Sequence, residues 1–252
     1  MNALRAAALG AAALWIATGC GDGDGARGGH PTVSAAASLK AAFEDYDRSL
    51  GGASARFNFG GSDELAAQIR QGAPADVYAA ADTSLPRALF RSGLVEKPVV
   101  FARNRLVVAV RAAGGRVRTL GDVARPGVKL ALGAASVPVG SYTRQVLARV
   151  PVAERRRILA NVRSNEPDVA GVVGKLLQGA ADAGFVYATD VVGARGRLRA
   201  IELPRALRPS IRYGAAVVRR ARHPRQAAAF IRGLLRGAGR RALRRAGFGT
   251  PG

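Results

Sequence analysis

Hydroxyl side chains stand where two apolar runs of this sequence give way to helical patterns. Ser38 follows "TVSAAA" and Ser62 follows "FNFGG", and in each case the next segment has apolar residues at helical spacing. A single serine at such a junction is most often an N-cap, whose hydroxyl accepts a free backbone N–H. A pair of such junctions also fits an anion site, because helix N-termini present unpaired N–H groups and a partial positive charge.

Three further segments place donors at strand ends. In "SVPVGSY", before the next helix, Val139 and Gly140 are positioned to offer backbone N–H groups. In "EPDVAG" either Asp168 or Glu166 is a candidate cap, with Val169 in the first turn. "GFVY" ends at Tyr187, which could equally be the ordinary end of an amphipathic strand. Hydroxyls and backbone N–H groups can all donate hydrogen bonds. Together with the two serines, these positions are candidates for an anion site at the strand ends.

The elements that must position these residues alternate short apolar runs with helical segments, which is typical of an α/β architecture. Two such series are joined by apolar strands expected at residues 105–110 and 211–218, and this predicts two lobes with a cleft between them. In open α/β sheets, ligands bind beyond the carboxyl ends of the strands. The candidate donors fall at those ends. We expect one lobe at 31–105 plus 216–252, and the other at 106–215.

The N-terminal segment indicates export. One arginine precedes the apolar run from Ala6 to Ala17, so residues 1–19 are expected to be a signal peptide, too short to span a bilayer. Cys20, the only cysteine, follows directly and resembles a bacterial lipobox cysteine, which predicts lipidation at Cys20 and a flexible tether over 20–30. An ordinary cleaved signal is the alternative. A single cysteine excludes an intrachain disulfide.

The net charge of +22 comes from 39 basic residues, of which only four are lysines. The arginines are spread along the chain with one cluster, "RRALRR", and no interleaved aromatic residues, so arginine-biased composition is favoured over nucleic-acid binding. A basic surface could also lie near anionic lipid or steer an anionic ligand. The only histidines are His30 and His223, and no metal-ligand spacing or Ser-His-Asp order is present. We therefore expect neither an enzyme nor a cofactor or directly bound metal.

The order and spacing of six pieces carry a family resemblance: "AAASL", "FGGSDELAAQIRQGAPADVYAAAD", "NRLVVAV", "VPVGSY", "NEPDVAGVV" and "DAGFVYATDV". Over essentially the whole chain after the tether, the sequence resembles the molybdate-binding proteins of bacterial molybdate ABC importers. The resemblance implies a two-lobed periplasmic-binding-protein fold of type II, with a βα sheet and helices on both its faces in each lobe. It departs from the family at Val139, where alanine is common, and in "TSLPRALF", which lacks a tryptophan.

The same resemblance implies the ligand, its contacts and the partners. Molybdate or tungstate would be held by the Ser38 hydroxyl and amide, the Ser62 hydroxyl, the amides of Val139 and Val169, and the Tyr187 hydroxyl. The implied protein is a monomer that delivers the anion to an ABC permease, is attached to the membrane by a lipid anchor and binds no nucleic acid. Two alternatives stay open: a binder of sulfate or another tetrahedral oxyanion, and a basic surface or nucleic-acid-binding protein.

Overall fold

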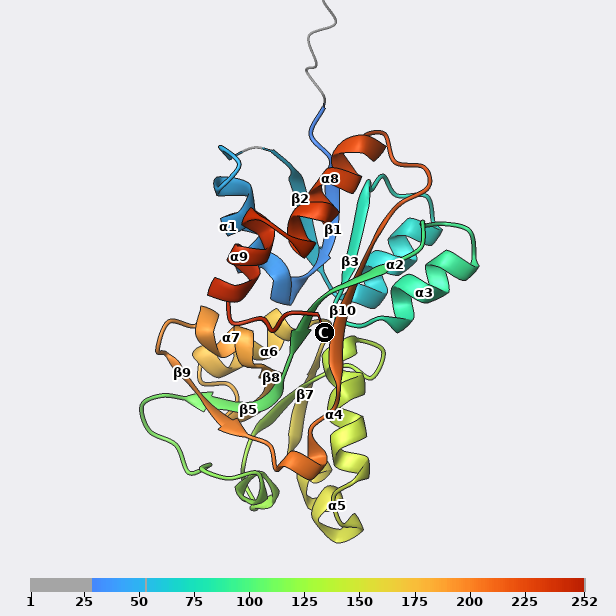
Figure 1. Cartoon of the computed structure of the whole chain (residues 1–252). Helices are drawn as coiled ribbons and strands as arrows, with labels where there is room; N and C mark the ends of the chain where they lie inside the picture. Colours follow the sequence, from blue (N-terminus) through green and yellow to red (C-terminus); the bar gives the residue numbers. More distant parts are fainter. Residues whose placement is uncertain (1–28, 53, 252) are drawn as a thin grey trace, which may run out of the picture.

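The computed structural model describes residues 29–52 and 54–251 of the 252-residue chain. The expected signal peptide, Cys20 and most of the expected tether lie outside these residues. Figure 1 shows two lobes, one above the other, each built around a sheet. The predicted two-lobed α/β architecture is confirmed.

The sheet of the first lobe has the strand order β2-β1-β3-β10-β4. Strands β1, β2 and β3 run parallel, and β10 is antiparallel to both β3 and β4. The strands are β1 (Thr32–Ala36), β2 (Arg56–Gly60), β3 (Val77–Ala80), β4 (Val99–Asn104) and β10 (Ile211–Val217). The helices are η1 (Ala37–Leu39), α1 (Lys40–Arg48), α2 (Ser62–Arg70), α3 (Ser84–Arg91), α8 (Pro224–Leu235) and α9 (Ala238–Arg245).

The sheet of the second lobe has the strand order β7-β6-β8-β5-β9, with β7, β6 and β8 parallel and β5 antiparallel to β8 and β9. The strands are β5 (Leu106–Arg111), β6 (Leu130–Gly133), β7 (Val162–Glu166), β8 (Ala183–Tyr187) and β9 (Leu198–Glu202). The helices are η2 (Gly121–Ala124), α4 (Pro138–Ala148), α5 (Val152–Ala160), α6 (Val169–Leu177), α7 (Ala188–Gly193) and η3 (Arg205–Leu207).

Apolar burial explains why these segments form sheets and covering helices. The central strands β3, β6 and β8 are buried at every residue, as expected of strands covered on both faces. In the first lobe, Phe43 of α1 packs edge-on against Phe230 of α8, with ring centroids 5.2 Å apart. Leu65 and Ile69 of α2 belong to a separate apolar cluster with Leu89 of α3.

The chain passes between the lobes at Arg105, which joins β4 to β5, and again between β9 and β10. The expected boundary at 215/216 is too late, because Ile211 already pairs with Asn104 in the first sheet. An apolar run predicts a strand but does not say which of two sheets it joins. Near the C-terminus, Gly249 pairs with Arg103 beside the same crossing.

Within the described residues, no helix has the length and apolar character needed to cross a membrane. The same part of the chain holds no group of three or more His, Cys, Asp or Glu side chains placed to bind a metal ion.

Candidate functional site

The five residues expected to contact an anion line one small pocket between the lobes. Ser38 and Ser62 come from the first lobe, whereas Val139, Val169 and Tyr187 come from the second. The cavity has a volume of about 20 Å³, far less than the ~300–1,000 Å³ of sites for drug-sized ligands. Its other lining residues are Ala36, Ala37, Gly60, Gly61, Ala81, Val137, Pro138 and Asp168. This small volume suits a small ion rather than a sugar or peptide.

Helix N-termini from both lobes converge on this pocket. Ser62 is the first residue of α2, Val139 the second of α4 and Val169 the first of α6. The first four N–H groups of an α-helix have no partner within the helix, and the helix dipole makes that end partially positive. The pocket therefore offers backbone donors and a positive potential without any lysine or arginine in its lining.

The cap interpretation of the two serines is wrong. Neither the helix start after Ser38 nor that of α2 has a side-chain cap bond, and Gly61, not Ser62, occupies the N-cap position of α2. The prediction of a cap before Val169 is confirmed, because Asp168 Oδ1 accepts a hydrogen bond from Gly171 N at 2.9 Å. Asp168 carries the one carboxylate among the described residues of the pocket lining, and this bond holds that carboxylate against its own helix.

The Ser62 hydroxyl is held so that its proton stays available. Ser62 is buried, and its Oγ accepts a hydrogen bond from the backbone N–H of Ala81 at 3.1 Å. Tyr78 Oη donates to the Ser62 carbonyl oxygen at 2.6 Å, which fixes the start of α2. With Oγ acting as acceptor toward the protein, its O–H is the donor left for a ligand.

The Tyr187 hydroxyl has no hydrogen-bond partner among the residues that the structure describes. Its side chain is 1% exposed, and Tyr187 Oη is one of two fully buried side-chain polar atoms without a hydrogen bond among the described residues. The other, Asp63 Oδ1, lies in the first turn of α2, where the helix dipole favours negative charge. Burial raises the pKa of Tyr187 well above its usual value, so the phenol keeps its proton. A buried hydroxyl without a partner is costly, and an anionic acceptor would satisfy it.

Sequence reasoning missed Tyr213, which connects the pocket to the crossing between the lobes. Tyr213 is fully buried, with Oη 3.0 Å from Ser38 Oγ and 3.3 Å from Asn104 Nδ2, which donates to it. Asn104 Nδ2 also donates to Thr189 Oγ1 of the second lobe at 2.9 Å. The Tyr213 ring meets that of Tyr187 edge-on, with centroids 5.8 Å apart. A phenol inside the apolar run "IRYGAAVV" was the available signal, since a buried tyrosine hydroxyl usually needs a partner.

The lobes touch directly at Gly61. A Cβ on Gly61 would lie 2.6 Å from the carbonyl oxygen of Pro167 in the second lobe. The backbone of Gly61 has φ −62° and ψ 133°, which any residue can adopt. Glycine is therefore required here by the close approach of the other lobe and not by its own conformation.

Asp190 is the acidic group behind Tyr187. Its Oδ2 accepts a hydrogen bond from the Tyr187 backbone N–H at 2.8 Å, and burial raises the pKa of Asp190 to about 7. Because this folded-state pKa exceeds the ~3.9 of a free aspartate, the folded protein binds the additional proton between those values. The stabilising contribution of that proton is complete below about pH 4 and is lost as pH rises through 7.

Replacing Asp190 by asparagine should therefore stabilise the protein at pH 8 and lose this advantage toward pH 5. The amide oxygen can still accept from Tyr187 N while the buried charge is gone. The difference in unfolding free energy between the two proteins should change by on the order of 1 kcal/mol per pH unit over this window. Urea unfolding at several pH values measures it, and a pH-independent difference would contradict the raised pKa.

The chain is similar in sequence to known solute-binding proteins. Residues 31–249 match the family described as bacterial extracellular solute-binding protein. The molybdate-binding protein ModA of Mycobacterium tuberculosis is 37% identical over 226 residues, which are 87% of this chain and 84% of that protein.

Solved structures share the fold. The periplasmic molybdate-binding protein of Azotobacter vinelandii superposes with a TM-score of 0.78 at 22% identity, over 88% of this chain and 100% of that one. The sulfate-binding protein SubI of Mycobacterium tuberculosis superposes with a TM-score of 0.70 at 19% identity, over 87% of this chain and 86% of that one. The predicted type II periplasmic-binding-protein fold is thus confirmed, and the fold alone does not select the anion.

Proposed function

Since the chain belongs to the bacterial extracellular solute-binding proteins, we propose that it captures molybdate between its two lobes and delivers it to an ABC importer. The observation that carries the proposal is the buried, unpartnered Tyr187 hydroxyl, in one pocket with two serines and the starts of three helices. The similarity to ModA over most of the chain supports molybdate as the anion. Tungstate, with the same charge and tetrahedral shape, belongs to the same proposal.

The chemistry of the anion matches the donors. Molybdate carries no proton at neutral pH, so each of its oxygens accepts hydrogen bonds and none donates. The Ser62 hydroxyl is left with a donor because its oxygen already accepts from Ala81 N, and Tyr187 keeps its proton. Hydrogen bonds to a charged acceptor contribute about 1.5–3 kcal/mol each. A handful of them would give micromolar affinity or better after the cost of ordering.

The proposal extends to the setting of the protein. We infer an exported, monomeric protein, lipidated at Cys20 and held outside the cytoplasmic membrane, that meets an ABC permease and catalyses no reaction. The family description and the periplasmic relative support the extracytoplasmic location. No cofactor is proposed, and molybdenum would be bound as its oxyanion rather than by direct coordination.

A calorimetric titration with molybdate, tungstate, sulfate and phosphate tests the ligand. Molybdate and tungstate should bind with a dissociation constant of about 1 μM or lower, and sulfate at least tenfold more weakly. If sulfate binds more tightly than molybdate, the ligand is sulfate, the alternative anion. If none of the four anions gives a heat of binding, the proposal is overturned. The affinity for molybdate should change little with salt concentration. The affinity of a nucleic-acid-binding surface, which contacts phosphates, would fall steeply as salt is added.

A further inference from the structure

A second depression lies at the opposite end of the first lobe from the anion pocket. It is formed where β1 and β3 begin and where the chain leaves β10 for α8, and we call it the basic groove after its lining: Arg56, Arg70, Arg219, Arg220, Arg222 and His223. Thr32 lines the groove, whereas Ala36, at the other end of β1, lines the anion pocket. At about 3.3 Å per residue, β1 separates the two sites by roughly 13 Å.

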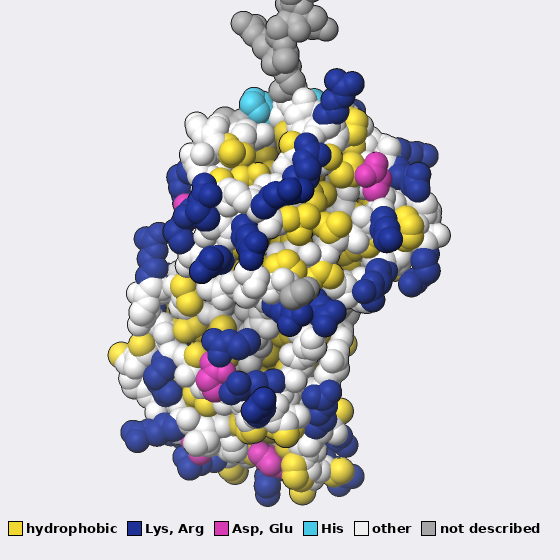
Figure 2. Space-filling view, in the orientation of Figure 1, with side chains coloured by type: hydrophobic (Ala, Val, Ile, Leu, Met, Phe, Trp, Pro, Cys, Tyr) yellow, Lys and Arg dark blue, Asp and Glu magenta, His cyan; other side chains and the backbone are white. Residues whose placement is uncertain are grey.

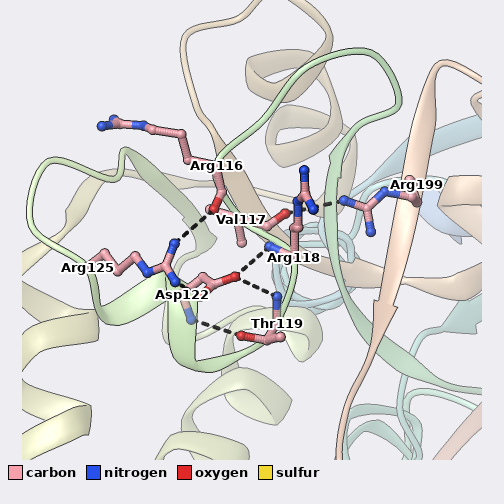
Figure 3. Close-up of polar contacts among 7 residues, drawn as sticks. All are labelled: Arg116, Val117, Arg118, Thr119, Asp122, Arg125 and Arg199. Atoms are coloured by element: carbon pink, nitrogen blue, oxygen red, sulfur yellow. Dashed lines mark hydrogen bonds and ion pairs between the residues drawn. The ribbon is translucent and has the colours of Figure 1, made fainter.

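The arginines of the groove are exposed and their charges are free. None of the five forms an ion pair with a carboxylate within the part of the chain that the structure describes. Some arginines elsewhere are bonded to the protein. In the second lobe, Arg125 pairs with Asp122 and donates to the Arg116 carbonyl, and Arg199 donates to the Val117 carbonyl (Figure 3).

Among the described residues that line the groove, Asp76 is the only acid, and its hydrogen bonds hold the groove together. Asp76 is 3% exposed, and its carboxylate accepts hydrogen bonds from the backbone N–H groups of Thr32 at 2.7 Å and His223 at 2.9 Å. His223 Nδ1 lies 3.3 Å from the same carboxylate. Asp76 thus joins the start of β1 to the loop before α8, and the arginines around it keep a net positive charge facing solvent.

We propose that the basic groove is a docking surface for the anionic phospholipid headgroups of a bilayer. Five free guanidinium groups around one groove match a surface of phosphate diesters, to which each basic residue adds attraction. The described chain also begins at this end, because β1 starts beside the groove (Figure 1). About a dozen residues separate Thr32 from Cys20, so an anchor at Cys20 would lie within ~40 Å of the groove.

Docking by this end leaves the anion pocket free. The pocket lies at the carboxyl end of β1 and the groove at its amino end, so a bilayer that covers the groove does not cover the cleft between the lobes. The protein would rest on the membrane with its binding site open to solvent. This inference does not depend on the identity of the bound anion.

Vesicle cosedimentation tests the docking surface with the chain from Gly21 onward, which has no acyl anchor and keeps every described strand and helix. Vesicles of 30% phosphatidylglycerol in phosphatidylcholine should bind this protein, and pure phosphatidylcholine should not. Each basic residue near such a surface strengthens binding about fivefold. Changing Arg219, Arg220 and Arg222 together to glutamine should therefore weaken binding at least tenfold, allowing for imperfect contact.

The control must separate the groove from total charge, because basic side chains are spread over the visible face of the molecule (Figure 2). The control variant changes Arg149, Arg156 and Arg157 together to glutamine. It removes the same charge from the end of α4 and from α5, which lies at the far end of the second lobe (Figure 1). This variant should bind anionic vesicles less than about threefold more weakly than the parent. Both variants should keep the anion affinity of the parent. Equal loss in the two variants, or no binding to anionic vesicles, would overturn the proposal.

Discussion

Replacing Tyr187 by phenylalanine should weaken molybdate binding about 10- to 150-fold without lowering the stability of the ligand-free protein. The affinity loss is that of one charge-assisted hydrogen bond, about 1.5–3 kcal/mol. The hydroxyl is buried and has no partner within residues 29–52 and 54–251, so its removal breaks no hydrogen bond in that part of the chain. Losing an unsatisfied buried polar group is expected to raise the free energy of unfolding, by about 1 kcal/mol.

Calorimetry and urea unfolding measure the two quantities, and Tyr78→Phe is the matched control for stability. Tyr78 is equally buried, but its hydroxyl donates to the Ser62 carbonyl oxygen at 2.6 Å. The same chemical change there should lower the free energy of unfolding by about 1 kcal/mol. If Tyr187→Phe keeps full affinity and loses stability as Tyr78→Phe does, the hydroxyl is a structural group and not a ligand donor.

Much of the candidate site was predictable because its residues sit where strands end and helices begin. Those transitions are local, and the pattern that places Ser62 after "FNFGG" also places it at the carboxyl end of a strand. Where the carboxyl ends of the strands in the two sheets face each other, the helix N-termini of both lobes lie close together. The predicted position of Ser62 at the end of a strand is confirmed, whereas the interpretation of its hydroxyl as a helix cap is wrong. Whether Ser62 Oγ caps its own helix or accepts from Ala81 N depends on where the end of β3 lies, because Ala81 follows that strand, 19 residues further along the chain.

The features that escaped prediction join distant parts of the chain. Tyr213 meets Ser38 across a separation of 175 residues, and nothing in the local pattern around either residue indicates that contact. The same is true of β10, whose apolar sequence fits a central strand of either sheet. Its place in the first sheet is decided by pairing with β3 and β4, which are far away in sequence. Local propensity determines elements, whereas long-range pairing determines which lobe they build.

Gly61→Ala should weaken molybdate binding at least about tenfold by preventing full contact between the lobes. The added Cβ would lie 2.6 Å from the Pro167 carbonyl oxygen, a backbone atom that can move only if the second lobe moves with it. Overpacking of this kind costs about 1–3 kcal/mol, and the part due to Pro167 falls on the closed arrangement. The other tight neighbour of the new Cβ, Asp63 Oδ1 at 3.0 Å, is the end of a side chain in the same lobe. Each lobe keeps its own core, so the unfolding of the ligand-free protein should be nearly unchanged.

Gly60→Ala provides the control, because it adds the same methyl group one residue earlier. There the nearest atoms to the new Cβ, from Glu64 and Leu65, are 3.8 Å away, which is an ordinary contact within the first lobe. Affinity should fall for Gly61→Ala and stay within about threefold of the parent for Gly60→Ala. Small-angle scattering with saturating molybdate should show a larger radius of gyration for Gly61→Ala alone. Equal behaviour of the two variants would mean that contact between Gly61 and Pro167 plays no part in holding the anion, and that the pocket donors act without closure.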